Sequence, residues 1–379
     1  MNLTVPLFTP RFTPADKNQL LKVLHSGWLT HGPFNEKFET DFARYLDVNH
    51  AVSVNSCASA LLVSLIAHKI KGEVIIPSFT FVATANAVVN AGATPVFVDV
   101  SYDTCNINPQ AINASITKIT EAIIPVHFGG QSAPMKPIMA LAQKHKLVVI
   151  EDSAETIGGL YQGKKTGSFG TGCFSFYPTK NLTTGEGGMV TTNSTRLASI
   201  IRTYAAHGIT TTAFIRQQTK QPWLRTATVA GYNFRMSGLQ AGLGISQLKR
   251  LDTMNRTRRR LASWYTRRLK NIEEIDVPVE SPNCYHVYQM YTIKVKKVDR
   301  TKFLAKLRQR GIDATVHFDP PVHKQLFYKK FCDHRTDLSV TNRLSRNIVT
   351  LPLFPAMTQQ QQVYVVNNIK AAIKVSRSS

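Results

Sequence analysis

Residues 175–189 read SFYPTKNLTTGEGGM, and this stretch gives the first strong indication of how the chain folds. An apolar run ends at Tyr177, Pro178 follows, and the next charged residue is Lys180. Glycines then occupy positions 185, 187 and 188. A solvated lysine needs no such setting, whereas a lysine that meets a ligand at close range benefits from a turn that lacks Cβ atoms. The stretch therefore predicts a buried strand followed by a ligand-binding lysine on a tight turn.

The first two-thirds of the chain alternates short apolar runs with helical patterns, which predicts an α/β fold with a mostly parallel, mixed sheet between helices. Several apolar runs do not alternate with polar residues, as is typical of strands buried on both faces. The expected strands are residues 73–77, 94–100, 121–126, 147–152, 172–177 and 188–192. The expected helices between them are residues 59–70, 84–93 and 134–146.

The last third of the chain predicts a smaller α/β domain. A long helix over about 237–270 is expected to link the two parts, which gives a large domain, 1–250, and a small one, 251–379. The small domain is expected to contain strands within 288–295 and 312–318 and helices near 300–310 and 358–375. Residues 209–230 have no clean period and many Thr and Gln, so we expect a mobile loop there.

Composition excludes several classes of protein. The 379 residues are 43% hydrophobic and 18% charged, so the chain can bury a sizeable core. No run approaches the ~20 consecutive apolar residues of a membrane helix, and no signal peptide is evident at the N-terminus. Five cysteines without a C-x-x-C pair argue against a disulfide framework or a metal site. We therefore expect a cytoplasmic protein with no metal and no membrane partner.

The charge of the chain is unusual. Lys and Arg number 46 against 23 Asp and Glu, a formal charge of +23. The densest basic run, 256–270, predicts a helix with a solvated arginine-rich surface. A positive field can attract nucleic acid or small anionic substrates, but no helix-turn-helix, zinc-finger or RNP-like pattern accompanies the run. Nucleic acid is therefore the less favoured partner.

Two chemically capable residues are expected at one edge of the sheet. Asp152 ends one predicted strand and Lys180 follows another, and ligands of such sheets gather at the carboxyl ends of the strands. Asp152 could simply cap a helix, or it could hold a heterocyclic nitrogen protonated. Lys180 could form an ordinary salt bridge, or it could form a Schiff base.

A third feature predicts a phosphate site. In residues 55–65, NSCASALLVSL, a turn of small residues runs directly into an apolar helix, so free N–H groups point outward at the helix start. Serine and asparagine are also ordinary helix caps, so this segment alone leaves both interpretations open. No G-x-G-x-x-G pattern is present, which disfavours a dinucleotide. A lysine, an acid and a phosphate turn together are what pyridoxal phosphate requires.

The chain resembles the DegT-type nucleotide-sugar aminotransferases, which are fold-type-I pyridoxal-phosphate enzymes. The resemblance covers nearly the whole chain in order. It rests on SGWLTHGP (26–33), NSCASAL (55–61), PSFTFVATANAV (77–88), GATPVFVDV (92–100), PVHFGGQ (125–131), EDSAETIGG (151–159), GSFGTGCFSFYPTKNLTTGEGGMV (167–190), GYNFRMSGLQAGLGISQLKRLD (231–252), VHF (316–318) and LPLFPAMT (351–358).

The resemblance implies a role for each matching residue. Lys180 would bind the cofactor covalently and move the proton, and Asp152 would pair with the pyridine nitrogen. Glu155 would lie within reach of the ring oxygen, and Phe81 would stack on the ring. The remaining positions fall into two groups: Cys57, Ala58, Ser59, Ser175 and, from the other subunit, Asn233 would bind the phosphate, whereas Gly27, Thr179, Arg235, His317 and Phe318 would lie near the sugar nucleotide.

The sequence departs from the family pattern at a few positions. Ala58 replaces a usual Thr, Phe318 a usual Tyr, and Gly238 a usual Asp or Asn. Glu155 stands where Gln or His is common, and it resembles the branch that aminates C4 of a 4-keto sugar, such as the perosamine synthases. Lys180 disfavours the sibling dehydratases, which have histidine there.

The resemblance implies a homodimer with shared active sites. The implied reaction moves an amino group from an amino acid, with glutamate expected, to a nucleoside-diphosphate keto-sugar for amino-sugar and polysaccharide biosynthesis. Two alternatives remain: another ketone, such as a 3-keto sugar or a cyclitol, or a regulatory, nucleic-acid-binding protein on the same scaffold.

Overall fold

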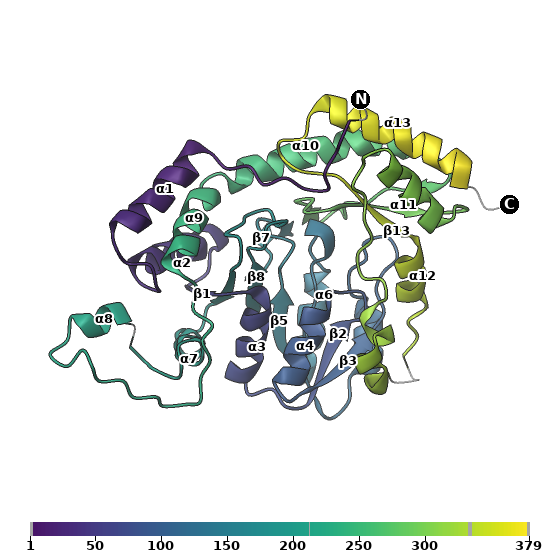
Figure 1. Cartoon of the computed structure of the whole chain (residues 1–379). Helices are drawn as coiled ribbons and strands as arrows, with labels where there is room; N and C mark the ends of the chain where they lie inside the picture. The colour runs from purple at the N-terminus through teal and green to yellow at the C-terminus, as the bar shows by residue number, and fades with distance from the viewer. Residues whose placement is uncertain (1–2, 212, 333–335, 377–379) are drawn as a thin grey trace.

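The centre of the molecule is a seven-stranded sheet with the order β1-β9-β8-β5-β4-β2-β3 (Figure 1). The computed structural model describes residues 3–211, 213–332 and 336–376. Among the described strands of this sheet, only β9 runs antiparallel to its neighbours. The strands are β1 (His50–Val54), β2 (Glu73–Pro77), β3 (Thr94–Val98), β4 (Thr120–Ile123), β5 (Val148–Asp152), β8 (Thr171–Ser175) and β9 (Gly188–Thr192).

Helices cover both faces of the sheet, which confirms the predicted fold class. In β2, Val74 and Ile76 face one core whereas Ile75 faces another, so a strand with no polar alternation has both of its faces buried. One face is covered by α3 (Cys57–Ala67), α4 (Val82–Asn90) and α7 (Thr195–Ala205). The other is covered by α2 (Pro33–Leu46), α5 (Pro109–Ser115), α6 (Met135–His145) and α9 (Gly238–Leu248).

A second core belongs to the last third of the chain. Its sheet is antiparallel, with the order β10-β12-β13, and consists of β10 (Ile275–Asp276), β12 (Tyr291–Val295) and β13 (Ile348–Leu351). Three helices pack on this sheet: α10 (Leu251–Leu269), α11 (Arg300–Gln309) and α13 (Gln359–Ser376). The N-terminal segment joins the same core, because Val5 is fully buried in it and pairs with Ile312.

The remaining elements are short or peripheral. They are α1 (Pro14–His25), α8 (Ala213–Gln217), α12 (Ser339–Asn347), β6 (Leu160–Tyr161), β7 (Lys164–Lys165), β11 (Cys284–Tyr285) and the 3-10 turns Phe128–Gly130, Val322–Lys324 and Leu326–Phe331. The segment 209–230 leaves the body of the molecule around α8 (Figure 1), and its residues 217–228 are all exposed. Its mobility remains a prediction.

Three expectations from the sequence were wrong. The single helix over 237–270 is two helices, because the chain turns at Lys249 and Arg250, where Arg250 pairs with the buried Asp16 at 2.6 Å. Residues 312–318 form isolated bridges, Val5 with Ile312 and Thr315 with Thr350, instead of a strand. The arginine-rich run is solvated only in part, since the side chain of Arg258 is buried.

Arg258 connects α10 to the chain that crosses beneath it. Its guanidinium donates to the carbonyl oxygens of Tyr288, Gln289 and Leu353, at 3.4, 3.3 and 3.0 Å. Burial lowers the pKa of Arg258 to about 10, which leaves it charged at neutral pH. An internal cation that donates to three carbonyls fixes the path of the segment around Gln289, which borders the cavity described next.

Candidate active site

A cavity of about 460 Å³ opens at the carboxyl edge of the seven-stranded sheet. One wall comes from the sheet and the helices that follow its strands, and the other from residues 289–290 and 317–318 of the last third of the chain. Ten of the fourteen residues predicted for the site line this cavity: Cys57, Ala58, Phe81, Asp152, Glu155, Ser175, Thr179, Lys180, His317 and Phe318.

Lys180 projects into the cavity from the turn after β8. The turn is closed by its own backbone, because Lys180 N–H donates to the Tyr177 carbonyl at 2.9 Å and Thr184 N–H donates to the Phe176 carbonyl at 3.0 Å. The Nζ atom of Lys180 lies 3.4 Å from the Oε1 atom of Glu155, and the lysine side chain is 15% exposed. The lysine is therefore held at the end of a buried strand with its amine free to meet a ligand.

Gly188 lets this strand pair approach the start of α3. A Cβ atom at Gly188, the first residue of β9, would lie 2.4 Å from the backbone carbonyl carbon of Ser56, so no larger residue fits without moving the chain. Gly185 and Gly187 have φ angles of 81° and 153°, in the region that favours glycine. The glycine-rich stretch thus brings Lys180 and the α3 turn to the same cavity.

Asp152 is the second charged residue of the site. It ends β5, is 5% exposed, and accepts hydrogen bonds from Thr84 Oγ1 at 2.8 Å and from the N–H of Ala154 at 3.2 Å. Burial raises the pKa of Asp152 above its ordinary value, and the bonds from Thr84 and Ala154 oppose this rise. A buried carboxylate at the cavity wall is stabilised by a cationic partner, and a protonated ring nitrogen is such a partner.

The start of α3 faces the same cavity. Ser56 caps this helix, and its hydroxyl accepts a hydrogen bond from Ser59 N–H at 3.1 Å. The N–H groups of Cys57 and Ala58 belong to the first helical turn, where no carbonyl of the same helix is available as an acceptor. Ser175, at the end of β8, lines the same cavity. This arrangement fits the phosphate of the expected cofactor.

Glu155 contacts both Lys180 and the backbone N–H of Gly129. Its Oε2 atom accepts a hydrogen bond from Gly129 N–H at 2.8 Å, which orients the other oxygen toward the lysine. His317 borders the same space and shares a hydrogen bond with Thr350 through Nδ1 at 2.7 Å. Burial lowers the pKa of His317, so the ring is neutral at physiological pH.

Two aromatic residues complete the cavity wall. Phe81 is 63% exposed and lies at the cap of α4, so its ring is available to contact a bound ligand. Phe318 has φ of +62° and packs edge-on against Phe79 and Phe128. A bulky residue in this backbone region is rare and is held there by its surroundings.

Four predicted residues lie outside the cavity lining. Ser59 is in the first turn of α3, where its hydroxyl is 3.0 Å from that of Ser56. Gly27 and Asn233 are exposed. Arg235 lies beside Asn233 and His207, with nitrogen contacts of 3.1 Å to the former and 3.0 Å to the latter.

The cavity also contains residues that the sequence did not single out. Thr84 lies within a quoted motif, but its contact with Asp152 depends on how α4 packs against β5. Gln289 donates from Nε2 to the Thr179 carbonyl at 3.1 Å, which connects the second core to the lysine turn. The other cavity residues missed from sequence are Ser56, Leu61, Thr80, Ala83, Val126, Ala154, Tyr177, Glu186 and Met290.

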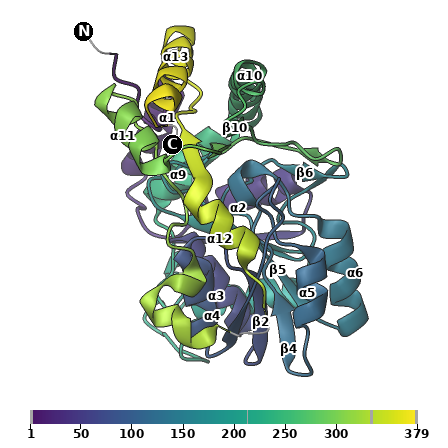
Figure 2. The same cartoon turned by 90° about the vertical axis from the view of Figure 1, so that its right-hand side faces the viewer.

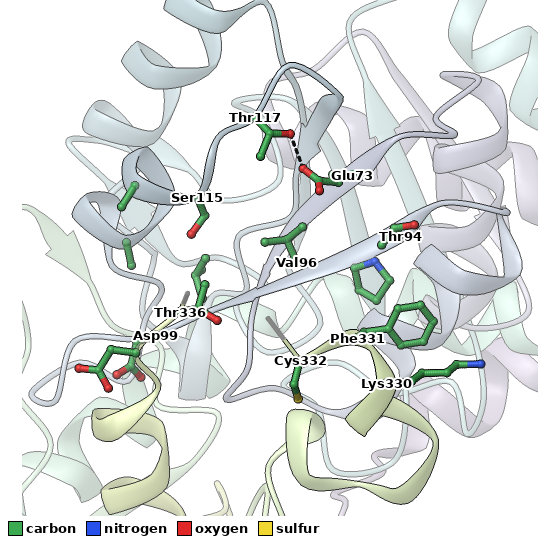
Figure 3. Close-up of a pocket in the computed structure, with 15 residues that line it drawn as sticks. Glu73, Thr94, Val96, Asp99, Ser115, Thr117, Lys330, Phe331, Cys332 and Thr336 are labelled. Atoms are coloured by element: carbon green, nitrogen blue, oxygen red, sulfur yellow. Dashed lines mark hydrogen bonds between the residues drawn. The ribbon is translucent and has the colours of Figure 1, made fainter. Parts of the chain in front are cut away.

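A larger cavity, of about 650 Å³, lies at the outer edge of the sheet beside β3 (Figure 3). Its acidic groups already have partners: Glu73 accepts a hydrogen bond from Thr117 at 2.5 Å, and Asp99 accepts from Val340 N–H and Thr341 at the start of α12. None of the predicted site residues borders it. The smaller cavity is therefore the candidate active site.

Within 3–211, 213–332 and 336–376, no group of three or more His, Cys, Asp or Glu could hold a metal ion. The same residues contain no helix long and apolar enough to cross a membrane.

Comparison with known proteins agrees with this geometry. Residues 10–370 match the model of the DegT/DnrJ/EryC1/StrS aminotransferase family. The spore coat polysaccharide biosynthesis protein SpsC of Bacillus subtilis is 37% identical over 385 residues, which is 98% of each chain.

Two solved structures of similar fold are an aminotransferase and a protein with a bound cofactor. PseC of Helicobacter pylori, an aminotransferase involved in pseudoaminic acid biosynthesis, has a TM-score of 0.89 and 28% identity over 98% of this chain and 100% of its own. NtdA of Bacillus subtilis, solved with the bound cofactor PMP, has a TM-score of 0.85 and 30% identity over 95% of this chain and 81% of its own.

Proposed function

Because the chain belongs to the DegT/DnrJ/EryC1/StrS aminotransferase family, we propose that it transfers an amino group from glutamate to a nucleoside-diphosphate keto-sugar. The chain is an aminotransferase of the sugar-aminotransferase type, and its cofactor is pyridoxal 5′-phosphate. The observation that supports the proposal best is the cavity in which a lysine, a buried aspartate and a helix start meet.

The chain's own residues would hold the cofactor at its different ends. The α3 turn at Cys57, Ala58 and Ser59, with Ser175, binds the phosphate through N–H and hydroxyl groups. Asp152 would accept a hydrogen bond from the protonated ring nitrogen, and the Thr84 hydroxyl keeps that carboxylate oriented. Phe81 covers one face of the ring.

Bound pyridoxal phosphate supplies a carbonyl carbon that accepts the amine and a ring that delocalises the charge left when a proton departs. Lys180 would hold the cofactor through its Nζ atom and would move the transferred proton at that same atom. Glu155 holds the lysine Nζ atom near the reacting centre. Asp152 and Glu155 are only 5% and 8% exposed, and this burial strengthens their charge interactions.

The keto-sugar would bind at the side formed by the second core. Thr179, His317 and Phe318 border that side, and the neutral His317 can donate or accept a hydrogen bond with a sugar hydroxyl. The net charge of +23 favours an anionic diphosphate. Glu155 favours a 4-keto sugar as the acceptor, and the similarity to SpsC supports a role in polysaccharide biosynthesis.

We further propose a cytoplasmic homodimer in which each subunit completes the site of the other. Gly27, Asn233 and Arg235 lie outside the cavity of their own chain, which supports a role toward a partner. Asn233 would then bind the partner's cofactor phosphate, and Arg235 and Gly27 would approach the partner's sugar nucleotide. We also propose that the chain divides at residue 250 into a large domain, 1–250, and a small domain, 251–379.

Absorbance and covalent labelling test the attachment site. The purified protein is expected to absorb near ~420 nm, as a lysine-bound carbonyl cofactor does. Borohydride should fix the cofactor to Lys180, and Lys180→Ala should abolish this label while the surface control Lys136→Ala keeps it. A label that persists in Lys180→Ala would refute the assignment.

A panel of acceptors tests the substrate class. The pyridoxamine form of the enzyme is incubated with 4-keto and 3-keto nucleoside-diphosphate sugars and with cyclitol ketones, and the product is identified by mass spectrometry and NMR. We expect amination of the 4-keto compounds. Faster amination of a 3-keto sugar or a cyclitol would replace the proposed substrate and leave the aminotransferase assignment unchanged.

A further inference from the structure

The excess positive charge is concentrated in the last third of the chain. Residues 251–379 contain 24 Lys and Arg against 10 Asp and Glu, whereas residues 1–250 contain 22 against 13. The last 129 residues thus carry +14 of the total +23. The proposed reaction does not account for this distribution. From this part of the chain, the only polar residues that border the cavity are His317 and Gln289, and neither is a lysine or an arginine.

Three helices of this part form one layer. Figure 2 shows α13 between α11 and α10 above the second sheet, and residues from all three helices, such as Tyr265, Phe303 and Ile369, share one core. Because their apolar sides all point into that core, their opposite sides face solvent together.

The solvent side of this layer is basic. On α10, Arg256, Arg260 and Arg267 recur at helical spacing and are all exposed. We call the full set the basic helical face: Arg256, Arg260, Arg267, Arg268 and Lys270 from α10 and its C-cap, Lys302, Arg308 and Arg310 from α11 and its C-cap, and Lys370 and Lys374 from α13.

These charges are not compensated by neighbours. The three helices contain a single acidic residue, Asp252, in the first turn of α10. Across the part of the chain that the structure describes, no member of the basic helical face forms an ion pair, in contrast to Arg259, which binds Glu280. Ten like charges with only one acidic residue on their helices repel one another, so the face gains stability when an anionic surface neutralises it.

The second sheet separates this face from the active site. In β12, Tyr291 and Ile293 pack toward the helices. Lys294 points the other way and donates to the Asp103 carbonyl at 2.9 Å, and Thr350 of β13 contacts His317 of the cavity. A partner can therefore cover the helices without closing the cavity.

The shape and composition of the face identify the kind of partner. Val363 and Val375 of α13 are 40% and 66% exposed among the lysines, as on helices that lie in a lipid interface. Across the described residues of these helices no aromatic ring is exposed, and Trp264 lies beneath Arg268, whose guanidinium is 3.6 Å from the ring centroid. The described residues of these helices therefore offer no fully exposed ring on which a base could stack, and three helices packed on one sheet offer no element that projects into a groove.

We infer that the basic helical face docks the enzyme onto an anionic membrane surface. This replaces the expectation from sequence that no membrane takes part. The docking is peripheral and electrostatic, with the two valines at the lipid boundary, and it does not depend on the identity of the sugar substrate.

Vesicle co-sedimentation of the cofactor-loaded enzyme tests the inference. The vesicles are phosphatidylcholine alone or phosphatidylcholine with a third of phosphatidylglycerol, at low and at moderate salt. We expect binding only to the anionic vesicles. The quadruple variant R256E/R260E/R267E/K270E should lower the partition coefficient more than ~100-fold, because each basic residue near an anionic surface contributes on the order of fivefold.

A matched variant controls for net charge. K69E/K118E/K136E/K144E changes the charge by the same amount at exposed positions around the main sheet, and it should retain most of the binding. Both variants should keep the aminotransferase activity in solution. Equal loss in the two variants, equal binding to neutral vesicles, or tighter face-dependent binding to duplex DNA than to anionic vesicles at the same salt would each overturn the inference.

Discussion

Thr84 shows how one hydroxyl can influence the charge of Asp152, the buried carboxylate that we propose to pair with the cofactor. It donates to Asp152 at 2.8 Å inside a buried wall, and this bond opposes the rise in pKa that burial causes. Thr84→Val keeps the shape of the side chain and removes the donor, so the pKa of Asp152 should rise further. We expect the acid limb of the kcat/KM profile to move to higher pH and kcat/KM at pH 7 to fall about 10-fold. Thr84→Ser should restore both, and an unshifted acid limb would contradict the proposed role of this bond.

His286 gives the fold a dependence on pH. Burial, and then the nearby charge of Arg259, lower the pKa of His286 to about 3 from an ordinary value near 6.5. Between these two pH values His286 is protonated in the unfolded chain and neutral in the folded chain. The free energy of unfolding therefore falls as the pH drops from about 6.5 toward 3. The slope is about 1.4 kcal/mol per pH unit, so this histidine should cost about 2 kcal/mol between pH 7 and pH 5.

Urea unfolding at the two pH values measures this effect. His286→Gln keeps an acceptor for Tyr288 N–H but cannot be protonated. Its stability should therefore change by about 2 kcal/mol less than that of the parent protein over the same interval. Equal changes in the two proteins would show that His286 does not carry the dependence.

Arg258 predicts a large difference between two neighbouring arginines. Arg258→Ala leaves a cavity and removes the donors from three carbonyls, so we expect a loss of about 3–5 kcal/mol in the free energy of unfolding. Arg256→Ala, two residues earlier on the exposed side, should change it by less than about 0.5 kcal/mol. Chemical denaturation compares the pair, and similar losses would mean that the internal hydrogen bonds contribute little.

The residue types of the site were predictable from sequence, but their contacts were not. Asp152 ends β5 and Lys180 lies on the turn after β8, where local pattern and sheet geometry together indicate a ligand site. Thr84 and Gln289 are ordinary polar residues whose importance arises when α4 packs on β5 and when the second core folds against the first. No local period encodes such contacts between distant segments.

At the scale of the element, the close approach of β9 and α3 is the most sensitive feature. Gly188→Ala would place a methyl group 2.4 Å from the Ser56 backbone, so the helix start must move away from the strand. We expect a loss of more than about 2 kcal/mol and weaker cofactor binding. Gly163→Ala provides the control, since its Cβ meets nothing within 4 Å and only its φ of +80° is strained. Cofactor titration should separate the two variants, and equal affinities would show that the phosphate turn does not depend on this approach.

The strands of the main sheet were predicted better than the long helix after residue 237 and the strands of the last third of the chain. The six expected strands of the main sheet are present with ends shifted by up to three residues, but β1, a five-residue strand held by pairing with β9, was missed. The break between α9 and α10 has no local signal, because Leu-Lys-Arg-Leu favours a helix. The Arg250–Asp16 ion pair, formed with a residue of α1, holds the chain where it turns. Residues 312–318 have a strand-like composition, yet their path is set by isolated pairings with the N-terminus and β13.

At the scale of the whole molecule, the proposed shared site predicts complementation between subunits. Lys180→Ala and Asn233→Asp each damage a homodimer, the second by placing a negative charge near the partner's phosphate. In a mixed dimer one site carries both changes and the other carries neither. Mixing after partial unfolding and refolding should thus restore roughly a quarter of the parental activity. An absence of recovery in mixtures that form dimers would show that Asn233 serves its own chain.

The two walls of the cavity have separate origins, and this arrangement has a consequence for engineering. The groups expected to activate the amine come from the main sheet and its helices, whereas the groups expected to recognise the ketone come from residues 289–290 and 317–318 of the second core. A combinatorial library confined to the second set can alter the accepted sugar while the amine-activating half stays intact. The cofactor spectrum then reports folding and loading for every member, independently of its turnover. Variants can therefore be selected for acceptor preference through the second core, while cofactor binding by the first core shows that each variant is folded and loaded.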